Sequence, residues 1–151
     1  MRGARVCVAG LIAPCVICTI GTICNFSAAG AQTSDGQKPR SARDGVYTLE
    51  QAQRGAAAYA RACAECHGAT LTNDEGAAPL AGRAFIDAWK PYSAGDLFER
   101  MRKTMPTAAP GSLGAREYVD ILAQILRANG YPAGNTEMEE RADVLRQIRI
   151  E

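Results

Sequence analysis

The chain has 151 residues, and its 17 basic and 16 acidic residues leave a formal net charge of only +1. This balance gives no indication of nucleic-acid binding, and we expect no nucleic-acid partner. The length suits about one domain. A single histidine excludes any site that needs two imidazole ligands.

Residues 1–31 have the pattern of a secretory signal peptide. Arg2 and Arg5 give a positive start, residues 6–24 are largely apolar, and residues 29–31 form a small-residue cleavage site. A retained membrane anchor is the alternative, but a proline and a glycine interrupt the apolar run. We therefore expect cleavage of the signal, a periplasmic location and no membrane span in the mature chain.

Residues 32–46 follow the signal and carry no apolar periodicity. Polar residues, glycine and proline dominate, a composition that does not supply a buried core. We expect a flexible leader here and a folded domain over residues 47–134.

The first helix of that domain has a clear start. Thr48 and Gln51 have the spacing of a capping box, and the helix that they open is expected to continue to the cysteines that follow. Gly55 lies inside this helix, where glycine costs about 1 kcal/mol relative to alanine. A second helix that passes close to the backbone at Gly55 would explain it. Gly68 ends the segment.

Cys63-Ala64-Glu65-Cys66-His67 is a C-x-x-C-H motif, the pattern of covalent c-type haem attachment. On a helical segment the two cysteines lie one turn apart, so their thiols can add to the two vinyl groups on one porphyrin edge. His67 is then carried beneath the ring, where its imidazole can bind iron as the proximal ligand. We predict one haem c at these residues.

Other uses of the motif fit this sequence less well. A structural zinc site needs four nitrogen or sulfur ligands, and after residue 31 the chain offers only Cys63, Cys66 and His67. A thioredoxin-like redox pair needs a βαβ setting, whereas residues 55–62 are alanine-rich helix formers. A chance match in an ordinary helix is the remaining alternative.

Residues 69–92 hold several glycine and proline breakers and predict an irregular segment with a short helix over residues 83–89. A ligating histidine usually donates its second ring N–H to an acceptor, and the carbonyl of Pro79, with Leu80 beside it, is a candidate. Trp89 could donate its indole N–H to a haem propionate. A plain turn proline and a buried core tryptophan are the alternatives.

The next helix is predicted over residues 96–103, starting after Ser93 and ending before a proline-rich loop. Because His67 is the only histidine, the second axial ligand is expected to be a thioether, from Met101, Met105 or Met138. Met101 lies on the apolar face of the helix, which predicts core packing, and Met138 lies in a hydrophilic segment, which predicts a surface residue.

Met105 differs from the other methionines because it precedes Pro106, which restricts it to extended conformations and removes it from the helix. A stiff loop can hold a sulfur atom against an iron that binds it weakly. We therefore predict Met105 as the distal ligand. His/Met ligation raises the reduction potential and closes the iron to small molecules, which favours a one-electron relay over an enzyme.

Residues 115–129 form the longest amphipathic pattern, bounded by Gly114 and Gly130. Residues 135–151 are charged, with a thin apolar stripe that predicts a tail helix packing back on the domain. No strand pattern persists along the chain, so we predict an all-α fold.

Three basic residues, Arg100, Arg102 and Lys103, precede the loop that holds Met105. Two interpretations stay open. They form either a solvated polar face or a positive rim that steers an acidic dehydrogenase towards the haem edge.

These motifs together resemble those of the class I c-type cytochromes over residues 47–134. The resemblance rests on Gly55, the C-x-x-C-H motif, Ala78-Pro79-Leu80, Trp89, Thr104-Met105-Pro106 and Tyr118. It implies three to five helices wrapped around one covalent haem, with Gly55 and Tyr118 where the first and last core helices cross. Residues 129–134 and the charged tail are similar to cytochromes fused to or paired with pyrroloquinoline-quinone dehydrogenases.

The expected function is that of a diffusible periplasmic one-electron carrier of the respiratory chain. Its donor would be a quinoprotein dehydrogenase, and its acceptor an oxidase or another cytochrome. A tightly bound electron-transfer subunit of a dehydrogenase complex is the first alternative. A haem enzyme or gas sensor with an open iron site is the second, and Met105 disfavours it.

Overall fold

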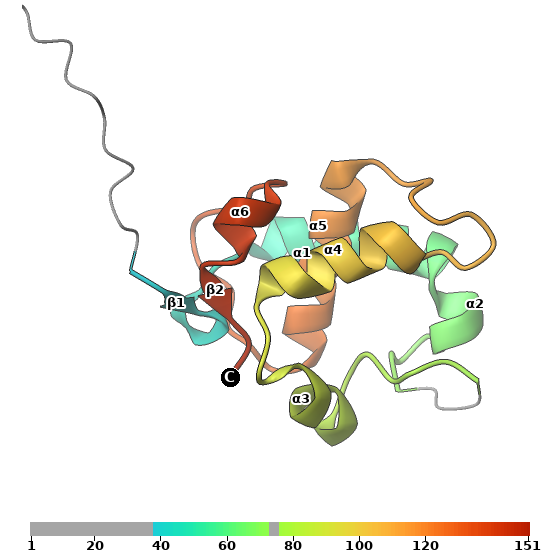
Figure 1. Cartoon of the computed structure of the whole chain (residues 1–151), viewed down its shortest axis with the longest axis horizontal. Coiled ribbons are helices and arrows are strands. Elements are labelled where there is room, and N and C mark those ends of the chain that lie inside the picture. Colours follow the sequence, from blue (N-terminus) through green and yellow to red (C-terminus); the bar gives the residue numbers. More distant parts are fainter. Residues whose placement is uncertain (1–37, 73–75) are drawn as a thin grey trace, which may run out of the picture. The chain divides into compact units, whose positions relative to one another are not determined.

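The computed structural model describes residues 38–72 and 76–151 and has the predicted all-α fold. Its helices are α1 (Leu49–Ala62), α2 (Ala64–His67), α3 (Arg83–Trp89), α4 (Ala94–Thr104), α5 (Ala115–Ala128) and α6 (Ala142–Leu145), shown in Figure 1. Two short strands, β1 (Arg40–Ser41) and β2 (Ile148–Arg149), and a 3-10 helix (Ala42–Asp44) complete it. The predicted signal peptide, residues 1–31, lies outside the described residues. Within residues 38–72 and 76–151, no helix has the length and apolar character of a membrane span.

The crossing of α1 and α5 explains the glycine inside α1. A Cβ atom added to Gly55 would lie 1.7 Å from the backbone oxygen of Asp120, so only glycine allows the helices to approach this closely. The Asp120 carboxylate also accepts hydrogen bonds of 2.9 and 3.0 Å from the guanidinium of Arg54. The expectation that a second helix passes Gly55 is confirmed, and α5 is that helix.

Only half of the predicted capping box forms at the start of α1. The Thr48 hydroxyl accepts a hydrogen bond from the Gln51 N–H at 3.1 Å, as predicted. The Gln51 side chain does not return to Thr48. Its amide instead donates to the Met138 carbonyl at 3.0 Å and accepts from the Met138 N–H at 2.9 Å. Met138 is consequently 5% exposed, and the prediction of a surface methionine was wrong.

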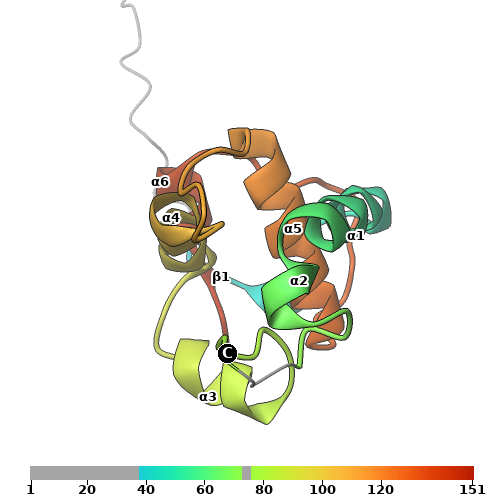
Figure 2. The same cartoon turned by 90° about the vertical axis from the view of Figure 1, so that its right-hand side faces the viewer.

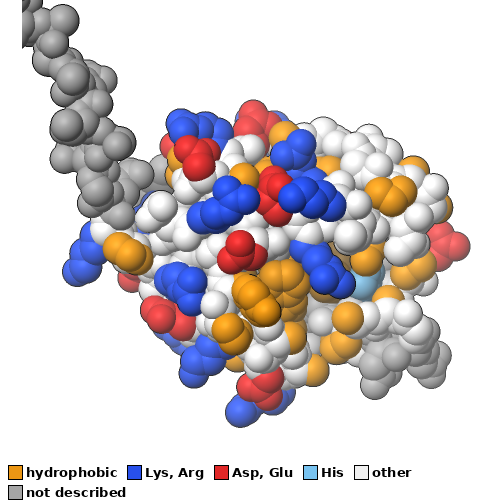
Figure 3. Space-filling model, in the orientation of Figure 1, with side chains coloured by type: hydrophobic (Ala, Val, Ile, Leu, Met, Phe, Trp, Pro, Cys, Tyr) orange, Lys and Arg blue, Asp and Glu red, His pale blue; other side chains and the backbone are white. Residues whose placement is uncertain are grey.

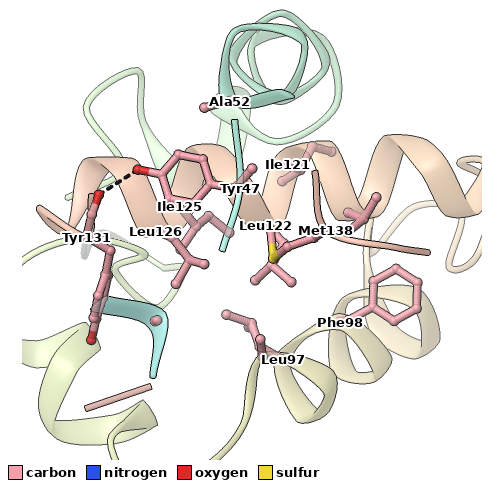
Figure 4. Close-up of a cluster of buried hydrophobic side chains, with 14 of the residues drawn as sticks. Tyr47, Ala52, Leu97, Phe98, Ile121, Leu122, Ile125, Leu126, Tyr131 and Met138 are labelled. Carbon is pink, nitrogen blue, oxygen red and sulfur yellow. Dashed lines mark hydrogen bonds between the residues drawn. The ribbon is translucent and has the colours of Figure 1, made fainter. Parts of the chain in front are cut away.

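The apolar faces of α4 and α5 meet in the core. The buried side chains drawn in Figure 4 include Leu97, Phe98, Ile121, Leu122, Ile125 and Leu126. Full burial of each such side chain stabilises the fold by about 1.5–3 kcal/mol. At one end of this core the Tyr47 hydroxyl donates a 2.6 Å hydrogen bond to the Tyr131 carbonyl.

The two ends of the described chain pair with each other. Arg40–Ser41 lies parallel to Ile148–Arg149, and the Ala42 and Val46 side chains that follow are buried. Residues 40–46, which fall in the expected flexible leader, are therefore part of the fold. Two small apolar side chains are enough to anchor this polar segment once the C-terminal strand lies beside it.

The C-terminal tail packs on the domain, but its helix is shorter than predicted. Helix α6 is a single turn, and its backbone lies so close to α4 that a Cβ atom on Gly95 would be 2.6 Å from the Arg146 nitrogen. After it, Ile148 and Ile150 are buried while Arg149 is exposed. This alternation has the period of a strand, which explains why the helical stripe does not continue.

Candidate haem-binding site

A cavity of about 850 Å³ lies among the helices and is lined by residues of α2, α3, α4 and α5. Figure 2 shows these elements arranged around the middle of the molecule. The volume falls within the usual range for cofactor sites, about 300–1,000 Å³. The cavity brings together every residue that the sequence predicted for the site: Cys63, Cys66, His67, Pro79, Leu80, Trp89 and Met105.

The C-x-x-C-H motif begins at Cys63, between α1 and α2, and its other four residues form α2. The Cys63 N–H donates to the Tyr59 carbonyl at 2.9 Å, and the His67 N–H donates to the Cys63 carbonyl at 3.0 Å. One helical turn therefore separates the first cysteine from the histidine. Cys63 is half-buried and Cys66 is exposed, so the thiol pair extends from the cavity wall to its outer edge.

Burial raises the pKa of the Cys63 thiol to about 11, with a further rise from the neighbouring Cys66. Redox-active C-x-x-C pairs require the opposite shift, because a lowered pKa is what supplies the attacking thiolate. The shift at Cys63 therefore has the opposite sign to the one that activates such a pair. In the described part of the chain, no three histidine, cysteine, aspartate or glutamate side chains group together to hold a metal ion.

The imidazole of His67 is held by a backbone carbonyl, although not by the one that we predicted. Its Nδ1 lies 2.9 Å from the Ala78 oxygen, one residue before Pro79. A carbonyl only accepts, so Nδ1 carries the proton and Nε2 is the nitrogen left to bind a metal. His67 is 8% exposed. In Figure 3 the pale-blue histidine shows in a recess of this face.

Pro79 and Leu80 line the cavity wall, and a residue that sequence reasoning missed holds them there. The Asn129 side chain donates to the Leu80 carbonyl at 2.9 Å and accepts from the Gly82 N–H at 3.0 Å. It thereby ties the loop after the motif to the end of α5. An asparagine at a helix end is typical of an ordinary helix terminus, so the sequence carried no signal for this second task.

Met105 ends α4 with φ −126° and ψ 151°, the extended conformation predicted from Pro106. Its N–H donates to the Met101 carbonyl at 2.8 Å, and its own carbonyl accepts from Gly111 at 3.2 Å. Met101 also lines the cavity, although it lies on the buried face of α4 and is 7% exposed. Met138 is not among the lining residues.

Trp89 belongs to a short row of aromatic rings at the cavity wall. Its ring centroid lies 6.3 Å from that of Phe85, in a stacked arrangement, and 5.7 Å from that of Tyr92, edge to face. Trp89 lines the cavity and packs on its neighbours, but it is half-buried and not a fully buried core residue.

The three basic residues of α4 are not equivalent. Only Arg100 lines the cavity. Lys103 and Arg102 contact the Glu99 carboxylate at 2.9 and 3.5 Å, and the Arg102 guanidinium also lies 5.4 Å above the Phe98 ring. Of the two interpretations, a positive rim at the cavity would rest on the Arg100 guanidinium, whereas Arg102 and Lys103 lie on the exposed face and share one acid, Glu99.

The domain is helical, and its cavity wall holds the C-x-x-C-H motif, a histidine ring bound to a backbone carbonyl, and a loop methionine. These features together define a c-type cytochrome. A family model described as cytochrome c oxidase, cbb3-type, subunit III matches residues 50–125, about half of the chain. The chain belongs to this family, and its fold is the class I cytochrome c fold. Searches of curated proteins and of solved structures found no match.

The residues present fit haem c, the covalently bound cofactor of this family. Cys63, Cys66, His67 and Met105 line the same cavity, and Met101 lines it as well. Apolar side chains, among them Leu97, Ile121 and Ile125, form walls suited to a flat macrocycle.

Proposed function

We propose that this chain is a one-electron carrier with a single haem c, bound through Cys63 and Cys66 and ligated by His67 and Met105. The observation that carries the proposal is the presence of both ligands and both thiols in the wall of one cavity. Haem c supplies an iron that gains or loses one electron between Fe(III) and Fe(II).

The chain's own residues fit this task. The Ala78 carbonyl, 2.9 Å from Nδ1, orients the His67 ring and leaves Nε2 to bind the metal. Met105 offers a neutral sulfur ligand that favours Fe(II) and keeps small molecules from the sixth position. Both residues are anchored by hydrogen bonds to the backbone, which would limit their movement when the charge at the iron changes.

Absorption spectroscopy of the purified holoprotein tests the ligation. The haem should remain attached after acid-acetone extraction, and the ferric protein should show the far-red sulfur-to-iron charge-transfer band. The ferrous protein should not bind carbon monoxide. Ready binding of carbon monoxide by the wild-type protein would favour an open-site haem enzyme or sensor instead.

We further propose a periplasmic carrier that takes electrons from a quinoprotein dehydrogenase and delivers them to an oxidase or another cytochrome. The name of the matched family, which refers to an oxidase subunit, supports an oxidase as acceptor. It equally raises a second candidate, a tightly held subunit of an oxidase or dehydrogenase complex. Amino-terminal sequencing of the exported protein should begin at Gln32, and co-purification with a partner under native conditions would identify the subunit arrangement.

A further inference from the structure

One side chain outside α4 and its loop holds the backbone of Met105. The Tyr118 hydroxyl, on α5, donates a 2.7 Å hydrogen bond to the Met105 carbonyl. Tyr118 is 2% exposed, and both residues line the haem cavity. The bond therefore lies at the wall of the site and not on the surface of the protein.

The other bonds to Met105 come from its own neighbourhood. The Met105 N–H donates to the Met101 carbonyl, one turn earlier in α4, and the Met105 carbonyl also accepts from the Gly111 N–H, later in the same loop. Such local bonds can move together with the loop. Tyr118 belongs instead to α5, whose position is set two residues later, where Asp120 meets the backbone of Gly55.

We infer that Tyr118 is a positioning residue, whose hydroxyl fastens the Met105 loop to α5 and so keeps the methionine sulfur on the iron. The inference rests on the proposed ligation by Met105. When an external ligand displaces the sulfur, the loop moves away from the site and the bond between Tyr118 and Met105 breaks. The free energy of that hydrogen bond therefore adds to the free energy of methionine ligation.

Imidazole titration of the ferric holoprotein tests this inference with Tyr118→Phe. Phenylalanine keeps the ring and removes only the hydroxyl. A hydrogen bond of this kind contributes enough to change an equilibrium constant roughly 2- to 10-fold, so the variant should bind imidazole that much more tightly. The far-red charge-transfer band should disappear at correspondingly lower imidazole concentrations.

Tyr47→Phe is the matched control. Tyr47 is also buried, at 1% exposed, and its hydroxyl also donates to a backbone carbonyl, that of Tyr131, at 2.6 Å. Tyr47 does not line the cavity. Its variant should lose similar thermal stability while its imidazole affinity stays that of the wild type.

A double-mutant cycle with Met105→Ala separates positioning from general loosening. Without the sulfur to hold, Tyr118→Phe should change imidazole affinity less than about twofold. Equal affinities of wild type, Tyr118→Phe and Tyr47→Phe would overturn the inference, as would an equal effect of Tyr118→Phe in the presence and absence of Met105. A wild-type protein that lacks the far-red band and binds imidazole as tightly as Met105→Ala would instead refute the ligation itself.

Discussion

Backbone context separates the two methionines that line the haem cavity. Met101 lies on the buried face of α4, whereas Met105 is extended and held by the loop and by α5. The sulfur of a core methionine is held by packing, and its removal leaves a void. The sulfur of a loop methionine can be presented to a metal at little cost to packing.

Alanine substitutions should therefore have opposite signatures. Met105→Ala should open the sixth position, lower the reduction potential and allow carbon monoxide to bind the ferrous haem. Met101→Ala should leave the far-red band intact and lower the free energy of unfolding by about 2–5 kcal/mol. Spectra and chemical denaturation of the two holoproteins measure both effects. Loss of the far-red band in Met101→Ala, with the band kept in Met105→Ala, would instead make Met101 the axial ligand and Met105 the packing residue.

At the scale of elements, two sets of contacts involve the helices around the cavity. The first is the approach of α1 to α5 at Gly55, and the second is the group of hydrogen bonds that caps the start of α4. In α4 the Ser93 hydroxyl accepts from the Asp96 N–H at 3.2 Å, and the Asp96 carboxylate accepts from the Ser93 N–H at 2.9 Å. Each contact leads to a prediction.

Gly55→Ala should destabilise the protein although alanine is the better helix former. Helix propensity alone predicts a gain of about 1 kcal/mol. The added methyl group would overlap the Asp120 backbone oxygen, however, and such overpacking costs about 1–3 kcal/mol or more. Thermal unfolding of the holoprotein measures the sign. Ala57→Gly on the exposed face of α1 is the control, and it should lower stability only by the difference in helix propensity, about 1 kcal/mol. A Gly55→Ala protein that is more stable than the wild type would mean that α1 and α5 separate easily.

Asp96→Asn should make stability less dependent on pH. The hydrogen bonds from Ser93 hold the pKa of Asp96 below its ordinary value of 3.8. Because the pKa of Asp96 is lower in the folded state than in the unfolded state, the ionised carboxylate stabilises the protein fully above about pH 4. This stabilisation is lost as the pH falls from there through the folded-state pKa. Wild type should exceed Asp96→Asn by about 1 kcal/mol at neutral pH, and the difference should shrink below about pH 4.

Chemical denaturation of both proteins at neutral and acidic pH measures this difference. Asp87→Asn is a control for the loss of a surface carboxylate, because the exposed Asp87 carboxylate pairs with the exposed Arg83 at 2.7 Å. A difference between wild type and Asp96→Asn that is constant with pH would show that the carboxylate's charge is not what stabilises α4.

At the scale of the whole molecule, the formal net charge is only +1, and Figure 3 shows basic and acidic side chains interspersed on one face. Long-range attraction of a partner would therefore depend on the cations near the cavity that form no salt bridge with another described residue. Arg100 lines the cavity, while Arg102 and Lys103 share Glu99. This arrangement makes Arg100 the best candidate for guiding an acidic redox partner.

Reduction by a quinoprotein dehydrogenase should slow as salt rises, because the Debye length falls to about 8 Å at physiological ionic strength. Arg100→Glu should slow the second-order rate several-fold at low salt and should slow it more than Lys103→Glu, the control with the same change of charge. Stopped-flow kinetics measure the rates. A rate indifferent to salt and to both substitutions would exclude electrostatic steering by α4.

The local chemistry of this protein was predictable from its sequence. The C-x-x-C-H spacing, the restriction that Pro106 imposes on Met105, and the boundaries of α3 and α5 all depend on residues close together in the chain. Covalent geometry and helix periodicity act over a few residues, so a single sequence carries their consequences. For the same reason the unusual glycine at position 55 indicated a helix crossing before the partner was known.

Contacts between distant residues were decided only by the tertiary structure. The choice of Ala78 over Pro79 as the acceptor for His67, the burial of Met138 by Gln51 and the pairing of β1 with β2 each join segments whose separation no local pattern encodes. The bond from Tyr118 to Met105 is of the same kind. A polar group can satisfy its hydrogen bond with many partners, and only the packed helices determine which of them lies within reach.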